Sequence, residues 1–339
     1  MDTAAVDYDL PIEAIAQTPV EPRDAARLLV DGGRRSRPTH QHVSDLPTLI
    51  GPGDVVVVNT TRVLPARLRL TKATGGAVEV LLLEPIADRV EGAWEALVRP
   101  SRKIPVGTEI VVGPDLTLAI GEDRGEGRRV VTLHLADGLS LIDALERHGT
   151  VPLPPYITAP LADPERYQTT YAQQPGSVAA PTAGLHLTPA VLDAVQATGA
   201  TLAAVELVVG LGTFRPIASA TVEDHQMHGE RYRVPEATMT ACAAADRVVA
   251  IGTTTVRALE SVAASGALEG RTELFIHGNR PFAVVDVLLT NFHQPRSSLL
   301  VLIEAFVGPR WRALYEEALV EGYRFLSFGD AMFLRGERG

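Results

Sequence analysis

The chain of 339 residues contains a single cysteine, Cys242. One cysteine can form neither an intramolecular disulfide nor a cysteine cluster for zinc, which indicates a reducing compartment. The chain also lacks any run of about 18 apolar residues, the length that a membrane-spanning helix needs. Its first residues, MDTAAVDYDLPIEAIAQTP, are acidic where a signal peptide is basic. We therefore expect a cytoplasmic protein that is neither exported nor embedded in a membrane.

An excess of positive charge is missing as well. The chain has 31 Lys and Arg against 41 Asp and Glu, a net charge of −10. Proteins that bind nucleic acid mainly by neutralising phosphates are usually basic, so the balance argues against a general affinity for nucleic acid. A local basic face is still compatible with it.

The hydrophobic pattern predicts an α/β fold with an inserted β domain. In GDVVVVNTTRVLPARL, Val55 to Val58 form a continuous apolar run typical of a buried strand. Between about residues 67 and 138, short β-branched runs alternate with turn signals and leave no room for crossover helices. We predict a mainly parallel-sheet α/β domain of residues 1–66 and 151–339, with most of the active site in the second part. Residues 67–150 are predicted to form a small antiparallel β-barrel domain.

The predicted β-barrel carries many basic residues. They form either a solvated face or a surface for a polyanion. The residues are Arg67, Arg69, Lys72, Arg99, Arg102, Lys103, Arg124, Arg128 and Arg129.

The segment VAAPTAGLHLT places His186 between two leucines, after a run of small residues. In a parallel α/β sheet, ligands bind at the carboxyl ends of the strands, where loops such as this one lie. Small side chains leave room for a ligand close to the backbone, toward which His186 would point. The alternative is a buried, hydrogen-bonded histidine that serves packing.

Two further strands end in polar residues. In IGTTTVRALES, the strand ends at Gly252, and Thr253 to Thr255 are expected to cap the next helix and expose its first amides to an anion. Arg257, one turn later, can hold a carboxylate by two bonds. In LLTNFHQPRSS, Asn291 and His293 precede another helix. Ligand binding competes with a simple threonine cap at the first site and with a structural turn at the second.

Three other motifs carry candidate chemistry. EDHQMHGE contains His225, His228 and Glu230, without a third metal ligand at a recognised spacing, so acid/base or polar binding and an ordinary loop stay open. Asp330 in FGDAMFL is either a structural acid or one with a perturbed pKa. GLGTFR lacks the third glycine of a dinucleotide fingerprint, and its glycines instead let the backbone turn or approach a ligand.

Eight blocks of the sequence together resemble one family, the S-adenosylmethionine:tRNA ribosyltransferase-isomerases of queuosine biosynthesis. The blocks follow one another in family order from near the N-terminus to near the C-terminus. They are GDVVVVNTTRVLPARL, VPLPPYI, QPGSVAAPTAGLHLT, VGLGTFRPI, EDHQMHGE, IGTTTVRALES, VVDVLLTNFHQP and FGDAMFL.

The resemblance implies an α/β domain with an inserted β-barrel, and an enzyme that uses S-adenosylmethionine as a ribosyl donor. The implied acceptor is the anticodon loop of a tRNA that carries 7-aminomethyl-7-deazaguanine at the wobble position. The implied products are epoxyqueuosine-tRNA, adenine and methionine. S-adenosylmethionine would be a consumed co-substrate, with no permanently bound cofactor and no metal, and the expected state is a monomer.

Carried onto this sequence, the resemblance also implies roles for the candidate residues. The candidate acid/base residues are His186, His225, His228, Glu230, His293 and Asp330. The candidate substrate-binding residues are Arg62, Arg67, Thr182, Gly184, Gly212, Thr213, Thr253, Thr254, Arg257 and Asn291. Among these, Thr253, Thr254 and Arg257 would bind the donor's methionine carboxylate or a substrate phosphate. Arg62 and Arg67 would contact the anticodon loop, where an unstacked base can be read.

The sequence departs from the family pattern in two places. His277, Gly278 and Asn279 stand where an aromatic-Pro-Gly turn is common, and Gln294 replaces the usual leucine of NFHLP. The departures bear on the local shape of the pocket and on the identity of the acceptor. Two alternatives stay open beside the transferase. One is the same rearrangement on a different deazaguanine or amine acceptor, and the other is a non-catalytic RNA-binding relative.

Overall fold

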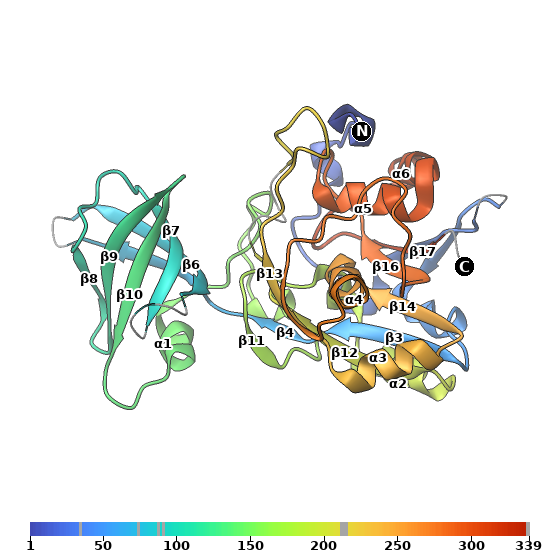
Figure 1. Cartoon of the computed structure of the whole chain (residues 1–339). Helices are drawn as coiled ribbons and strands as arrows, with labels where there is room; N and C mark the ends of the chain where they lie inside the picture. The colour runs from blue at the N-terminus through green and yellow to red at the C-terminus, as the bar shows by residue number, and fades with distance from the viewer. Residues whose placement is uncertain (34–35, 73–74, 87–88, 90–91, 211–215, 337–339) are drawn as a thin grey trace. The chain divides into compact units, whose positions relative to one another are not determined.

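A computed structural model describes the chain except residues 34–35, 73–74, 87–88, 90–91, 211–215 and 337–339 (Figure 1). The chain divides into two compact units. The α/β unit comprises Met1–Arg62, Pro154–Gln174 and Ala180–Gly339, and the β unit comprises Val63–Leu153 and Pro175–Ala179.

The α/β unit is built on a nine-stranded mixed sheet. Its central strands β12, β3, β14 and β16 run parallel, whereas β17 is antiparallel to β16 and the outer strands β13, β15 and β2 are antiparallel to their neighbours. The spatial order is β15 (Glu269–Thr272), β13 (Glu230–Arg233), β12 (Thr201–Leu207), β3 (Asp54–Asn59), β14 (Arg247–Ile251), β16 (Val287–Asn291), β17 (Ala331–Arg335), β1 (Arg27–Val30) and β2 (Thr39–His42).

Strand β3 shows why this sheet is central to the unit. Every residue of β3 is buried, as its uninterrupted apolar run predicts for a strand covered on both faces. Val56 and Val58 belong to the same core cluster as Val191 and Val195 of α2. The alternate residues of β3 face the other side of the sheet, where α3 and α4 contact β3 and β12.

Helices and short 3-10 turns connect the strands. The α-helices of the α/β unit are α2 (Pro189–Ala197), α3 (Glu236–Ala244), α4 (Thr253–Ser265), α5 (Ser298–Val307) and α6 (Trp311–Val320). The 3-10 turns are η1 (Thr3–Val6), η2 (Ile12–Ala14), η3 (Arg23–Ala25), η4 (Val43–Thr48), η5 (Pro164–Tyr167), η6 (Thr182–His186) and η8 (Gly308–Arg310). Short strands β4 (Thr61–Val63) and β11 (Gln174–Ser177) pair with each other.

The β unit contains a six-stranded antiparallel sheet (Figure 1). Inward residues alternate along its strands, as Leu116, Leu118 and Ile120 do in β9. The first and last strands, β5 and β8, also contact each other, so the sheet curls into a barrel-like shape. The order is β5 (Arg67–Thr71), β6 (Ala77–Pro85), β7 (Ala93–Arg99), β10 (Arg128–Leu135), β9 (Leu116–Gly125) and β8 (Glu109–Gly113), followed in the chain by α1 (Leu141–His148).

The structure refines the predicted fold in two respects. The sheet is mixed rather than mainly parallel, since two helices, α5 and α6, separate β16 from β17 in the chain and β17 runs antiparallel to β16. The strand that follows β12, β13, also departs from a parallel arrangement, because it pairs antiparallel with β12.

Candidate functional site

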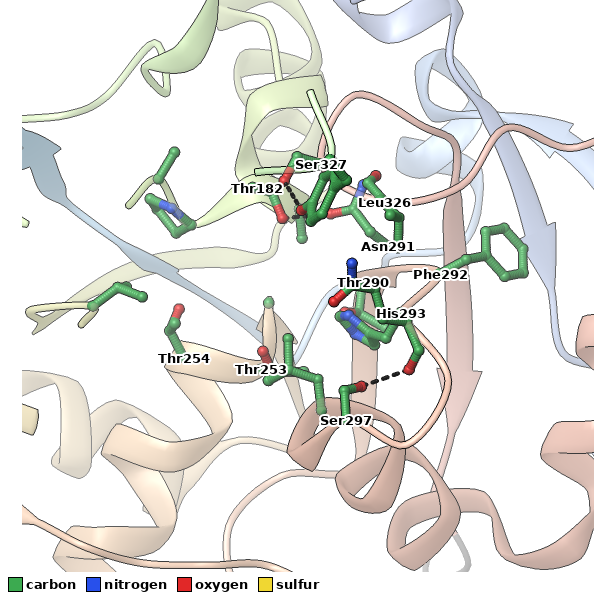
Figure 2. A pocket seen from close by; sticks show the side chains of 18 residues that line it. Thr182, Thr253, Thr254, Thr290, Asn291, Phe292, His293, Ser297, Leu326 and Ser327 are labelled. Carbon is green, nitrogen blue, oxygen red and sulfur yellow. Dashed lines mark hydrogen bonds between the residues drawn. The ribbon is translucent and has the colours of Figure 1, made fainter. Parts of the chain in front are cut away.

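A pocket lies in the α/β unit where β14 and β16 end, and we call it the strand-end pocket. It encloses about 610 Å³, part of which is open solvent. Figure 2 shows its lining, with Thr253 and Thr254 on one side and Thr182 and Asn291 on the other. The described lining residues are Tyr156, Ala180, Pro181, Thr182, Ala183, Val209, Gly252, Thr253, Thr254, Thr290, Asn291, Phe292, His293, Gln294, Ser297, Leu299, Leu326 and Ser327.

Helix α4 begins at the edge of this pocket. Its N-cap is Gly252, with a φ of 87°, and no side chain caps the helix. The expectation that the threonines cap α4 is therefore wrong, because Thr253 is already its first helical residue. The hydroxyl of Thr255 donates to the Ile251 carbonyl instead, and that of Thr254 accepts a bond from Asn59.

Asn291, the last residue of β16, connects both sides of the site. Its Oδ1 accepts a hydrogen bond from Thr182 Oγ1 at 2.9 Å. Its Nδ2 lies 3.1 Å from His186 Nε2, 3.2 Å from the carbonyl oxygen of Leu326 and 3.4 Å from that of Asp330. Because carbonyls can only accept, these contacts fix the orientation of the amide.

His186 lies behind Asn291 and lines a second, smaller cavity with Arg23, Arg166 and Ser327 rather than the strand-end pocket. Burial, and to a smaller extent the positive charges of Arg166, Arg23 and Arg324, lower its pKa to about 4. Since the Asn291 amide donates to Nε2, the neutral ring carries its proton on Nδ1.

His293 lines the strand-end pocket itself. Its Nε2 lies 2.9 Å from Thr290 Oγ1. Its backbone is held from both sides, since the N–H donates to Tyr315 Oη at 3.0 Å and the carbonyl accepts from Tyr8 Oη at 2.5 Å. Burial lowers the pKa of His293 to about 3, so the imidazole is neutral near pH 7.

Sequence reasoning missed three polar residues at this site. Tyr156 and Ser327 line the pocket with their hydroxyls 2.7 Å apart, and burial raises the pKa of Tyr156 to about 12. Asn59, at the carboxyl end of β3, bonds both backbone groups of Leu207 and so fixes the end of β12. The position of Asn59 directly after the buried valine run was the available signal for it.

The predicted residues Gly184 and Asp330 make close contacts with other parts of the protein. Gly184 faces Tyr171 and Thr169, and an added Cβ would lie 2.0 Å from the Tyr171 hydroxyl. The Asp330 carboxylate accepts the backbone N–H groups of Arg27 and Arg324 at 2.9 and 2.8 Å. Burial raises the pKa of Asp330, and these bonds act in the opposite direction.

Four more predicted residues lie outside the pocket lining, as His186, Gly184 and Asp330 do. Arg257 and Glu230 form a buried ion pair with each other, and Glu230 also accepts the N–H of Gly210. His225 stacks edge-on against Phe275, and its pKa is lowered by burial and by His228, which is exposed. Their catalytic or binding roles stay predictions.

The remaining candidates lie elsewhere. Arg62 pairs with Glu165 at 2.5 Å, and Arg67 donates to the Leu153 carbonyl within the β unit. Gly212 and Thr213 lie outside the described residues. The predicted basic surface needs a correction, because Arg129 is buried and donates to backbone carbonyls, among them that of Gly121.

The family described as queuosine biosynthesis protein matches residues 3–334. The chain belongs to this family. It is 50% identical over 337 residues to the S-adenosylmethionine:tRNA ribosyltransferase-isomerase of Rubrobacter xylanophilus, covering 99% of this chain and 98% of that protein. It is 44% identical to the protein of the same name from a Nostoc species, covering 98% of this chain and 92% of that protein. These relatives are named as enzymes.

A solved structure is also similar to this family member. It is the crystal structure of an S-adenosylmethionine tRNA ribosyltransferase from Thermotoga maritima, with a TM-score of 0.55 and 35% identity. The match covers 97% of this chain and 99% of that one. Within the described part of this family member, no three His, Cys, Asp or Glu side chains lie close enough together to hold a metal ion. None of its described helices has the length and apolar character needed to cross a bilayer.

Proposed function

We propose that this family member transfers and isomerises the ribosyl group of S-adenosylmethionine onto 7-aminomethyl-7-deazaguanine at the wobble position of tRNA. The products would be epoxyqueuosine-tRNA, adenine and methionine. The observation that carries the proposal is the strand-end pocket, which gathers hydroxyl, amide and imidazole groups at the carboxyl ends of β14 and β16 in a chain of this family.

The lining of the pocket suits a small polar co-substrate. The described lining consists of neutral groups, with no Asp, Glu, Lys or Arg. A neutral lining suits S-adenosylmethionine, whose sulfonium, ammonium and carboxylate partly balance one another.

His293 is the best-placed proton acceptor for the proposed reaction. The sulfonium makes the neighbouring 5′ carbon acidic, so the rearrangement can begin with removal of a proton from that carbon. Among the described lining residues only His293 and Tyr156 titrate, and the raised pKa of Tyr156 keeps its hydroxyl protonated. His293 is neutral near pH 7 and has one unprotonated ring nitrogen, although burial also makes it a weaker base than a free imidazole. Its place in the pocket lining, rather than its basicity, is the ground for this assignment.

The tRNA acceptor needs cations outside this neutral pocket. In the β unit, Arg99, Arg102 and Lys103 are exposed and make no ion pair with any described residue. Arg69, Arg124 and Arg128 are each within 4 Å of a glutamate carboxylate. We assign the first three to phosphate contacts with the tRNA, since unpaired surface cations attract a polyanion most strongly.

The direct test is incubation with S-adenosylmethionine and tRNA that carries 7-aminomethyl-7-deazaguanine. Adenine and methionine should be released in equal amounts, at the rate at which the modified base disappears. Controls are the same tRNA with guanine at the wobble position and the free deazaguanine base without tRNA. Release with the free base alone would replace the tRNA assignment by another acceptor, and no release with any acceptor would refute the transferase activity.

A further inference from the structure

The start of helix α4 opens directly into the strand-end pocket. Thr253 and Thr254, its first two residues, both line the pocket, and no side chain caps the helix. Their backbone N–H groups have no acceptor among the residues that the structure describes. The partial positive charge at this end of a 13-residue helix therefore faces the pocket.

The hydroxyl of Thr253 gives independent evidence for a ligand at this point. The residue is only 6% exposed, yet its hydroxyl has no hydrogen-bond partner among the described residues. Figure 2 shows its side chain at the start of α4, on the pocket side of the helix. The hydroxyl is open to the pocket beside the free amides, so a ligand there can bond to the hydroxyl and the amides together.

Gly252 makes this arrangement possible. Its φ of 87° turns the chain sharply between β14 and α4, a conformation that other residues rarely adopt. A serine, threonine or aspartate at the N-cap would bond the first amides itself and close them to a ligand. The glycine cap leaves them open.

The charges around the pocket indicate which kind of anionic group binds at the start of α4. No Lys or Arg belongs to the described lining, and Arg257, one turn along α4, is already paired with the buried Glu230. A phosphate would normally bring a basic side chain to such a site. A single carboxylate beside its own ammonium group needs only the helix terminus and a hydroxyl donor.

We infer that Thr253 and the first amides of α4 bind the carboxylate of the amino-acid part of S-adenosylmethionine. This inference rests on the proposed function, because that function places S-adenosylmethionine in the strand-end pocket. It assigns no binding role to Arg257.

The test compares two ligands on four proteins by titration calorimetry. The ligands are S-adenosylmethionine and its decarboxylated form, which lacks only the carboxylate. The proteins are the wild type, Thr253→Val, Thr253→Ser and the control Thr255→Val, which changes the same helix turn but removes a hydroxyl bonded to Ile251 and absent from the pocket lining. Thermal unfolding of each variant checks that it is folded.

The wild type should bind S-adenosylmethionine about 10- to 100-fold more tightly than the decarboxylated ligand. Thr253→Val should weaken S-adenosylmethionine binding about tenfold, because it removes one hydrogen bond to a charged group. The affinity for the decarboxylated ligand should stay within about twofold of the wild-type value. Thr253→Ser should restore the preference, and Thr255→Val should keep it.

Equal losses for both ligands, or an unchanged preference in Thr253→Val, would overturn the carboxylate assignment. So would a wild type that binds both ligands equally. If the enzyme still released adenine from S-adenosylmethionine in the tRNA assay, the proposed function would remain valid although the carboxylate assignment had failed. Conversely, carboxylate-dependent binding without product release with any acceptor would refute the proposed reaction and keep this site.

Discussion

Asn291 organises the site through contacts that only an amide can make. Its oxygen accepts from Thr182 while its nitrogen faces two carbonyls and a ring nitrogen of His186. A single side chain thus joins the pocket lining to the cavity behind it. We propose that His186 supports the pocket through its contact with Asn291.

Asn291→Asp should destabilise the protein at neutral pH. The change places a carboxylate oxygen against the carbonyls of Leu326 and Asp330 and removes two donors from a buried position. We expect the free energy of unfolding to fall by about 2–3 kcal/mol in denaturant titrations. The matched control Asn279→Asp makes the same chemical change at an exposed position and should have little effect. Equal stability of the two variants would contradict the assigned amide orientation.

The two buried histidines should make stability depend on pH. The pKa values of His186 and His293 fall from an ordinary 6.5 to about 4 and about 3, so below pH 6.5 the unfolded chain binds protons that the folded chain does not. Stability should therefore fall as pH decreases, by about 1.4 kcal/mol per pH unit for each histidine, until the pH reaches the folded pKa.

Denaturant titrations between pH 7 and pH 4 measure this slope. His186→Gln or His293→Gln should each remove about half of the histidine contribution. His134→Gln, at an exposed position, should leave the slope as it is. Identical slopes in all four proteins would show that these histidines do not carry the pH dependence.

At the scale of elements, the loop after β16 is positioned by residues distant in sequence. Tyr8 follows η1, Tyr315 lies in α6, and their rings meet edge-to-face with centroids 5.1 Å apart. Between them they bond the carbonyl and the N–H of His293. The two tyrosines therefore set the position of the imidazole that we assign as proton acceptor.

Tyr8→Phe and Tyr315→Phe should lower kcat for adenine release while S-adenosylmethionine binding changes little. Each removes one hydrogen bond, at a stability cost of about 1 kcal/mol for the first and about 1–3 kcal/mol for the second, which leaves a buried N–H unpaired. The control is Tyr232→Phe in β13, which loses a similar bond to the Ala267 carbonyl but lies outside the pocket lining. If all three variants lose stability but none loses kcat, the positioning role is wrong.

The elements themselves were largely predictable from sequence. The run Val55 to Val58 is buried in β3, and alternation in the β unit matches its antiparallel strands, because hydrophobic periodicity reports burial directly. The cap of α4 was not predictable, since threonines are good N-caps and only the backbone shows that Gly252 takes that position. The antiparallel direction of β17 relative to β16 likewise depends on packing, which a local sequence pattern does not encode.

For the whole molecule, binding of tRNA should depend on the unpaired cations of the β unit. Replacing Arg99, Arg102 and Lys103 with alanine should raise the KM for tRNA about tenfold or more at about 0.1 M salt and reduce its salt dependence. The Kd for S-adenosylmethionine should stay unchanged. Steady-state kinetics at several salt concentrations measure both effects.

A second triple variant separates this claim from a loss of net charge. Arg69, Arg124 and Arg128 lie in the same unit but have glutamate partners, so their replacement should have a smaller effect on the KM. Equal effects of the two triple variants would indicate a general charge effect and no specific docking surface.

The sequence predicted which loops form the site better than it predicted the roles of the individual residues. Thr182, Thr253, Thr254, Asn291 and His293 do line one pocket, because the carboxyl ends of neighbouring strands meet at one edge of the sheet. Arg257 and Glu230 were assigned separately but pair with each other across 27 positions of the chain. Such a pairing depends on tertiary contacts. So does the need for a glycine at position 184, where a larger residue would collide with Tyr171.

The most direct test of the central claim is a crystal structure of the protein with S-adenosylmethionine. We predict that the ligand lies in the strand-end pocket, with its carboxylate at the start of α4 beside Thr253 and its 5′ carbon within reach of His293. Density for the ligand at another position, with the strand-end pocket filled only by water, would show that this pocket is not the S-adenosylmethionine site.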